Sequence, residues 1–413
     1  MEKTPKELYN ARLKRVEDAI QLKVPDRVPI VPFEGYFPSK YCNVKADAAF
    51  YDPARWRKAV KETITALEPD LYFVNSGFPG HAFERLGCKQ VKWPGQPGIS
   101  GTHQFVEGEY MKADEYDSFC YDPSDYIVRS YLPRVFSALE PLKNLLPLNS
   151  ITLGYMEAMQ ADIFVKPEFT ALFEAFAEAG LEIQSWKAEW EDFKQEMKEL
   201  GFPDFAVSKT QAPFDIISDY HRGMRGTMLD LFRKPDELLQ ACEKLVPALI
   251  DRAVLFSVES GNPRVFIPLH RGSEGFMSKE HFETFYWPTL KKVIVALVDK
   301  GLTPCPFFEG DFTSRLEYIL ELPKGKIMAH FDATDLFKAK EVIGNHTCIR
   351  GNVPVSLFTA GTPRDVKEYC KKLIDIVGKD GGFVMCSGGT MDEAKVENVM
   401  AMYDFTKEYG VYN

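Results

Sequence analysis

The chain has 413 residues, of which 45% are hydrophobic and 27% charged, so its composition is that of a water-soluble globular protein with a sizeable core. Its 60 acidic residues outnumber its 50 basic residues, giving a net charge of −10, and no basic stripe stands out. These features disfavour nucleic-acid binding. The longest apolar runs are too short to cross a membrane, and the charged N-terminus has no apolar signal core.

The eight cysteines are spread along the chain without any CxxC pair. This spacing predicts reduced thiols in a cytoplasmic protein rather than a disulfide scaffold. No zinc-finger spacing occurs either. A metal site would therefore be assembled from positions that are distant in the sequence.

Taken in chain order, the pattern predicts eight short apolar strands separated by helices. A charged amphipathic helix comes first, within residues 1–23, and residues 87–200 form an excursion with a hairpin near 104–111 and a long helix over 167–200. A cap at Thr313 or Ser314 predicts a further helix after the fifth strand. The predicted strands are 28–33, 70–74, 205–209, 264–269, 302–308, 326–331, 347–351 and 382–386, and the main other helices are 53–67, 235–260, 335–343, 362–378 and one that ends near residue 410.

The count of eight strands predicts a single (β/α)8 TIM barrel over residues 1–413, with an N-terminal helical extension and a β-hairpin and helical insertion. A doubly wound open sheet is the alternative. Neither GxGxxG nor GxxxxGK[ST] is present, which disfavours NAD and ATP as ligands.

Chemically competent side chains lie where the predicted strands end, which is where active sites of parallel α/β proteins are built. Glu309 follows the fifth strand, His330 lies at the end of the sixth, and Cys386 ends the eighth. Their O, N and S atoms are predicted to hold one zinc with an open fourth position, with His270 as the reserve ligand. The structural alternatives are an ion pair for Glu309, a satisfied core histidine for His330 and a small buried apolar residue for Cys386.

Aromatic residues also gather near the predicted strand ends, and they favour an apolar cleft for a flat ligand. Arg271 is predicted at the polar end of this cleft, as an anion or substrate contact. The predicted substrate-binding residues are Phe33, Tyr36, Phe37, His81, His270, Arg271, Phe307 and Phe308.

Several motifs lie next to the predicted strands and helices: Asp26-Arg27-Val28-Pro29, Gln211-Ala212-Pro213-Phe214, Met277-Ser278-Lys279-Glu280-His281-Phe282, Tyr286-Trp287-Pro288, Gly351-Asn352-Val353 and Cys386-Ser387-Gly388-Gly389. They resemble those of the uroporphyrinogen decarboxylase superfamily, and this resemblance implies a single (β/α)8 barrel. The decarboxylase branch has an arginine-bearing MRQAGR-type segment after the first strand, whereas residues 33–40 here are acidic and aromatic. Decarboxylation of a porphyrinogen with eight carboxylates is therefore disfavoured.

The chain looks more like the cobalamin-dependent methyltransferase branch, which holds zinc through an HxC pair and a later Cys. The HxC positions fall on Phe307 and Glu309, and the later Cys matches Cys386. The resemblance implies transfer of a methyl group from a small methoxylated, aromatic compound to the Co(I) of a separate corrinoid protein, with Glu309 as ligand or acid and His330 in place of the lost nitrogen. No DxHxxG signature is present, so cobalamin is expected on the partner.

Three other functions stay open at this stage. The first is methyl transfer from a corrinoid to a thiol such as coenzyme M, where zinc would keep the thiolate. The second is a decarboxylase. The third is a non-enzymatic binding or chaperone module for the corrinoid protein. The sequence leaves the oligomeric state open, with a homodimer among the options.

Overall fold

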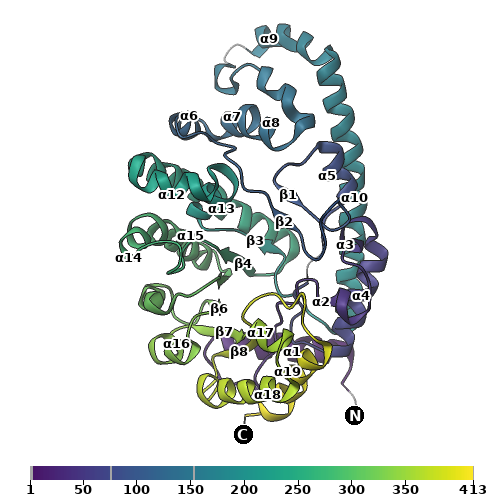
Figure 1. Ribbon diagram of the computed structural model, residues 1–413, viewed down its shortest axis with the longest axis vertical. Coiled ribbons are helices and arrows are strands. Elements are labelled where there is room, and N and C mark those ends of the chain that lie inside the picture. The colour runs from purple at the N-terminus through teal and green to yellow at the C-terminus, as the bar shows by residue number, and fades with distance from the viewer. Residues whose placement is uncertain (1–2, 75–76, 152–153, 413) are drawn as a thin grey trace.

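A computed structural model describes residues 3–74, 77–151 and 154–412 of the chain. Its central element is a six-stranded parallel sheet in the order β3-β4-β5-β6-β7-β8, surrounded by helices (Figure 1). These strands confirm the last six predicted strands to within a few residues. Their bounds are β3 Ser208–Lys209, β4 Arg264–Leu269, β5 Thr303–Phe308, β6 Met328–Phe331, β7 Cys348–Val353 and β8 Phe383–Ser387.

The first two predicted strands, 28–33 and 70–74, form isolated bridges instead of regular ladders, so the prediction of eight full strands is wrong for them. Ile30 pairs with Met385 of β8, and Tyr72 pairs with Asp204 just ahead of β3. The N–H of Asp70 donates to the Ile30 carbonyl at 2.9 Å, which links the two segments. Prolines on both sides of Ile30, at 29 and 32, have no N–H to donate to a ladder.

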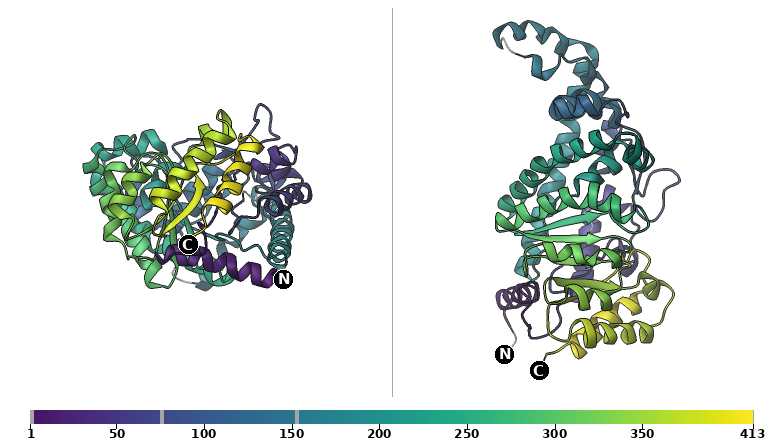
Figure 2. Two further views of the ribbon diagram at one scale, coloured as in Figure 1. Left: turned by 90° about the horizontal axis from the view of Figure 1, so that it is seen from below. Right: turned by 90° about the vertical axis from the view of Figure 1, so that its left-hand side faces the viewer.

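Helices flank the sheet and connect its strands (Figures 1 and 2). The predicted helix after β5 is a 3₁₀ helix, η7, and the expected cap is wrong: Phe312 occupies the N-cap position, and the Thr313 hydroxyl donates to Asp311. No helix among the described residues is long and apolar enough to span a membrane. The helices around the sheet are α1 Pro5–Ile20, α2 Phe37–Tyr41, α3 Ala48–Tyr51, α4 Pro53–Leu67, α11 Pro213–Ile216, η5 Ile217–His221, α12 Gly223–Arg233, α13 Pro235–Ser260, α14 Lys279–His281, η6 Phe282–Tyr286, α15 Trp287–Asp299, η7 Thr313–Glu321, α16 Leu336–Ile343, α17 Val355–Thr359, α18 Pro363–Lys372, η8 Leu373–Val377 and α19 Val396–Tyr409.

Residues 87–200 lie mostly at the end of the molecule far from both chain termini, and α10 runs back from there along its side (Figure 1). The predicted hairpin is present as a short antiparallel pair, in which Val91 faces Phe105 and Lys92 faces Gln104. Helix α5 Gly80–Leu86 directly precedes this region. The elements of the region are β1 Val91–Lys92, β2 Gln104–Phe105, α6 Tyr116–Tyr121, α7 Pro123–Tyr126, η1 Ile127–Tyr131, α8 Leu132–Val135, η2 Ser137–Asn144, η3 Leu148–Ser150, α9 Gly154–Glu157, η4 Ala158–Val165 and α10 Pro167–Glu199.

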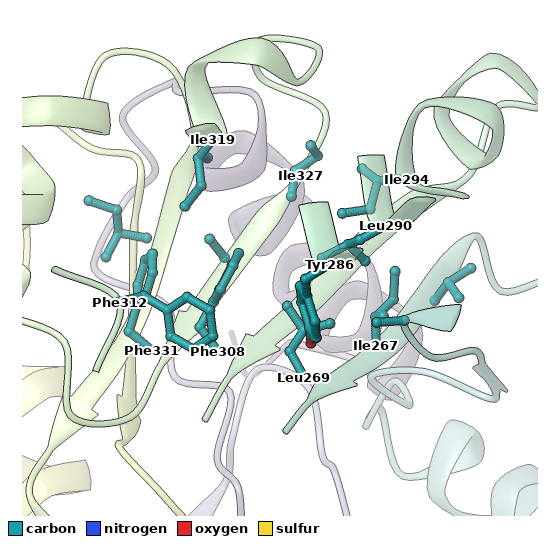
Figure 3. Packing of buried hydrophobic residues seen from close by; sticks show 14 of the residues in the cluster. Ile267, Leu269, Tyr286, Leu290, Ile294, Phe308, Phe312, Ile319, Ile327 and Phe331 are labelled. Atoms are coloured by element: carbon teal, nitrogen blue, oxygen red, sulfur yellow. The ribbon is translucent and has the colours of Figure 1, made fainter. Parts of the chain in front are cut away.

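The core has two layers because side chains alternate along each strand. One layer, the inner face of the sheet, contains Phe266, Phe307 and Met328. The other, the outer face, packs against the helices; there Phe308 stacks on Phe331 with ring centroids 5.0 Å apart (Figure 3). Phe37 and Phe308 both belong to the outer layer, so their predicted contact with substrate is wrong.

Candidate functional site

A cavity of about 640 Å³ lies at the carboxyl ends of the strands and is lined mainly by phenylalanine rings. Phe33 stacks on Phe73 at 5.5 Å between ring centroids, and Phe73 lies 4.9 Å from Phe266. An apolar pocket with a few polar groups is the usual form of a site for a small organic ligand. We call it the phenylalanine cavity; its lining includes Phe33, Phe73, Phe78, Phe83, Phe105 and Phe266 with the polar side chains of His103, Lys209 and Tyr220.

Phe307 and His330 lie beneath these rings. Phe307 meets Phe33 edge to face at 5.0 Å, and the His330 ring is 4.6 Å from the Phe307 ring. The His330 Nε2–H donates to the Ser387 carbonyl at 2.8 Å. Burial, helped by the charge of Arg350, lowers the pKa of His330 well below its ordinary value. His330 is therefore a neutral imidazole that supports the aromatic floor.

A second group of side chains lies where β4 and β5 end, and we call it the mouth cluster: Asp215, Asp219, His270, Arg271 and Glu309. The His270 Nδ1–H donates to Asp219 at 2.5 Å, and Arg271 forms an ion pair with the same carboxylate at 2.9 Å. On the other side of the ring, His270 Nε2 lies 3.7 Å from Glu309. The carboxylate of Asp219 thus orients His270 with its Nε2 free for a further contact.

Asp215 stabilises the turn after β4 by hydrogen bonds to its backbone. This buried carboxyl group accepts the backbone N–H of His270 at 2.9 Å, that of Arg271 at 3.0 Å and the Tyr286 hydroxyl at 2.7 Å. Burial and the charge of Asp219 raise its pKa, whereas His270 and the hydrogen bonds act against that rise. Asp215 and Asp219 are four residues apart, so they lie on one face of the helical segment α11–η5.

The mouth cluster favours a protonated His270. Burial acts to lower the pKa of His270, but the hydrogen bond to Asp219 and the surrounding carboxylates outweigh it, and the net shift is upward. Burial also raises the pKa of Glu309. Two groups with raised pKa values, within 4 Å of each other at the ends of β4 and β5, are suited to deliver a proton to a ligand bound between them.

The structure does not bring Glu309, His330 and Cys386 together as the predicted zinc site. Strand register sets Phe307 beside His330, so Glu309 lies beyond the level of the imidazole. Burial raises the pKa of the Cys386 thiol, which lies beside the guanidinium of Arg350. No group of three or more His, Cys, Asp or Glu residues suited to a metal exists in the described part of the chain. The residues present do not fit zinc, and a buried cation among them would repel it.

This geometry predicts the metal content of the protein. The purified wild type is expected to hold no stoichiometric zinc, because His330 uses Nε2 on a carbonyl and Cys386 stays a buried thiol. Elemental analysis of the wild type and of Cys386→Ala should therefore give the same result. One zinc per chain in the wild type that is lost in the variant would contradict this prediction.

Two other predicted contacts lie outside the phenylalanine cavity. Tyr36 is buried behind it, and its hydroxyl hydrogen-bonds His103 Nδ1 at 2.7 Å. His81 is on the exposed side of α5, 3.2 Å from Glu84. Of the predicted substrate contacts, Phe33 lines the cavity, Phe307 lies under it, and His270 and Arg271 belong to the mouth cluster.

Glu34 is a buried acid that the site does not use. Neither carboxyl oxygen has a hydrogen-bond partner of good geometry among the described residues. Burial raises the pKa of Glu34 to about 8, and the neighbouring Tyr403 hydroxyl only partly opposes this. Folded protein therefore keeps this proton up to about pH 8, while the unfolded chain loses it near pH 4.5. Because the folded state binds more protons, this group lowers stability as pH rises through that window.

Replacing Glu34 by Gln is expected to remove this pH dependence. From pH 5 to pH 8 the wild-type group should reduce the free energy of unfolding by on the order of 3 kcal/mol, and Glu34→Gln should not show that loss. Urea unfolding at both pH values measures the difference. The exposed Glu397→Gln on α19 is the control, and equal pH slopes for all three proteins would contradict a buried, protonated Glu34.

Comparison with known proteins places this arrangement in a family. Residues 205–409 match the model of the family Uroporphyrinogen decarboxylase (URO-D), a span that begins just ahead of β3 and ends within α19. This match, over just under half of the chain, confirms the predicted resemblance to the uroporphyrinogen decarboxylase superfamily. The matched span includes the whole mouth cluster, and this agrees with the resemblance seen in the motifs.

Two known proteins that are similar to this chain are methyltransferases. Methylcobamide:CoM methyltransferase MtbA from Methanosarcina acetivorans is 25% identical over 174 residues, which are 40% of this chain and 50% of that protein. The match thus spans about half the length of that curated relative. A methyltransferase structure from Methanosarcina mazei aligns over 99% of both chains with a TM-score of 0.61 at 16% identity, which shows a shared fold.

Sequence reasoning missed several residues of the site. Lys209 ends a predicted strand, and Phe73 and Phe266 lie within predicted strands, but nothing in the local pattern singled them out. Asp215 and Asp219 follow the Gln211-Ala212-Pro213-Phe214 motif at a spacing of one helical turn. That pair of acids, placed just after a strand end, is the signal that would have identified the support of His270.

Proposed function

We propose that the chain is a cytoplasmic methyltransferase, built on a (β/α)8 barrel, that takes a methyl group from a small methoxylated aromatic compound and passes it to the Co(I) of a separate corrinoid protein. The observation that carries this proposal is the phenylalanine cavity together with a protonatable His270, which directly follows β4, the strand whose Phe266 lines that cavity. The superfamily and its methyltransferase relatives support it, and the eight free cysteines agree with a reducing compartment.

The chemistry asked of the protein is modest but specific. A Co(I) corrinoid bound to the partner protein would supply the electron pair for the new bond to the methyl carbon. The CH₃–O bond breaks, and its electrons stay on the departing oxygen, which is a poor leaving group without help. His270 Nε2–H donates its proton to that oxygen, while Asp219 stabilises the ring through Nδ1. The stacked phenylalanines hold the aromatic ring and exclude water.

Transfer to a thiol is the second candidate, because the matched relative is named as a CoM methyltransferase. The structure supports this reaction less well. A thiolate nucleophile is normally kept by zinc or by a nearby cation, and the positions of the HxC pair hold Phe307 and Glu309 here. The acid pair His270 and Glu309 at the strand ends suits protonation of an oxygen leaving group better than activation of a thiol.

The test is a reaction with purified components. The protein is mixed with a reduced corrinoid protein and a methoxyarene, and loss of the Co(I) absorbance is followed. The proposal predicts loss that depends on both enzyme and methoxyarene, with release of the demethylated phenol. Formation of a methyl thioether from methylated corrinoid and coenzyme M, with no reaction of any methoxyarene, would instead support the second candidate. Robust decarboxylation of a porphyrinogen would overturn both.

A further inference from the structure

A second cavity, of about 370 Å³, lies against the phenylalanine cavity, and the two share Lys209 and Tyr220 as lining residues. Its character is different. Most of its lining residues have polar side chains, two of them are cations, and none of the described lining residues is a carboxylate. We call it the cationic cavity; it is lined by Tyr131, Lys209, Thr210, Gln211, Ile216, Tyr220, His221, Leu249 and Arg252.

The two cations of this cavity have no counter-charge. Within the described ranges, neither Lys209 nor Arg252 has an ion pair or a hydrogen bond to a side-chain acceptor; Arg252 only lies over the Phe256 ring, at 5.7 Å. Desolvation and the charge of Arg252 lower the pKa of Lys209. Asp219 acts in the other direction, but His270 and Arg271 already occupy its two oxygens. Both side chains reach solvent, and no carboxylate of the described residues pairs with them, so an anion that enters the cavity can bind them.

Strand register places Lys209 at the phenylalanine cavity. Lys209 pairs with Phe266, whose ring lines that cavity, and both residues face the same side of the sheet. Lys209 therefore lies between an apolar space that suits an aromatic ring and a cationic space that suits an anion. A ligand with a ring and one acidic group would fill both.

We propose that the substrate is a methoxylated aromatic acid, whose ring occupies the phenylalanine cavity and whose carboxylate is bound by Lys209, with Arg252 adding positive charge. This inference rests on the proposed function and adds the anionic group. A carboxylate bound there forms a charge-assisted hydrogen bond with Lys209, whereas a neutral methoxyarene leaves the ammonium unpaired. One lysine and one arginine suit a single acidic group rather than the many carboxylates of a porphyrinogen.

The experiment compares two probes that differ only in the carboxylate, para-methoxybenzoate and methoxybenzene. Their binding to the full-length protein is measured by calorimetry without a corrinoid protein. Lys209→Met is expected to weaken binding of para-methoxybenzoate, relative to methoxybenzene, by about 10- to 100-fold, and Lys209→Arg to restore part of it. The control is Lys187→Met, an exposed lysine of α10 whose loss changes the net charge equally.

The outcomes separate this inference from the proposed function. If Lys209→Met weakens the binding of both probes equally, or if the wild type binds both with equal affinity, the inference of an acidic group on the substrate is wrong. This holds even when methyl transfer from methoxybenzene occurs. If para-methoxybenzoate binding depends on Lys209 but no methoxyarene reacts with a corrinoid protein, the binding of an aromatic acid stands and the proposed methyl transfer fails.

Discussion

Replacing His270 by Asn is expected to lower kcat for methyl transfer by about 100- to 10,000-fold, the usual contribution of a positioned general acid. The physical reason is that the departing oxygen then leaves as an unprotonated anion in an apolar cavity. His270 Nδ1 is held by Asp219 at 2.5 Å, so its Nε2–H is oriented before substrate binds. The measurement is single-turnover loss of Co(I) absorbance at saturating methoxyarene, with the melting temperature as a check that the variant is folded.

The pH profile tests the same role independently. The carboxylates around His270 raise its pKa above the ordinary value of 6.5, so wild-type kcat should fall as pH rises through that raised pKa and the acid is lost. Asp219→Asn removes the main stabilising hydrogen bond and should move this fall to lower pH. The control is His281→Asn, because the ring of His281 packs against Phe232 and Phe285 and belongs to no part of the mouth cluster. A His270→Asn enzyme with full kcat and an unchanged profile would assign proton delivery to another group.

Replacing Asp70 by Ala should have the largest effect on stability, about 3–5 kcal/mol, because it removes a buried carboxylate that pairs with both Arg15 and Arg27 and leaves the buried Ile30 N–H without its acceptor. Asp70 is fully buried and accepts from Arg15, from Arg27 at 2.9 and 3.0 Å, and from the N–H of Ile30 at 2.7 Å. Its backbone N–H also bonds Ile30. One carboxylate thus joins helix α1 to both segments that reach the edges of the sheet. Urea unfolding followed by far-UV circular dichroism measures the loss.

The control for Asp70 is an ion pair on the surface. Glu368→Ala breaks the exposed pair with Arg364 in α18 and should change stability little. Asp70→Asn tests whether charge or hydrogen bonding dominates, since the amide oxygen can still accept from one arginine. If Asp70→Ala unfolds at the wild-type urea concentration, the buried pairs contribute nothing net and burial of apolar surface alone holds α1 in place.

The regular part of the fold was predicted well because the spacing of hydrophobic residues and the positions of turn residues indicate the same strands and helices there. The strand at 264–269 and the helices at 53–67 and 235–260 coincide with β4, α4 and α13. The failures have local physical reasons. Prolines around Ile30 prevent a regular ladder, and the Thr313 hydroxyl bonds Asp311 rather than capping η7. The spacing of hydrophobic residues predicts neither the missing ladder at Ile30 nor the missing cap at Thr313.

The candidate site was harder to predict because its partners are set by strand register and by which face a side chain occupies. Position at a strand end correctly marked His270, Arg271 and Glu309 as neighbours. It could not show that Phe308 faces the helices, or that Arg350 lies between His330 and Cys386 and disfavours a metal. A change of one residue in register moves each side chain of a strand to the other face of the sheet. The sequence alone does not show the register between distant strands.

The bridge between Ile30 and Met385 also determines when the protein can finish folding. At a synthesis rate of 5–20 residues per second, the early segment waits roughly 20 to 70 s on the ribosome before its partner strand exists. Throughout that time its apolar side chains and unpaired backbone are available to other nascent chains. The last turns add to the delay, since Val28 donates to Gly410 and Tyr412 donates to Asp26. Co-expression of chaperones that hold unfolded chains should therefore raise the soluble yield of this protein. A ligand that stabilises only the folded state should raise it less.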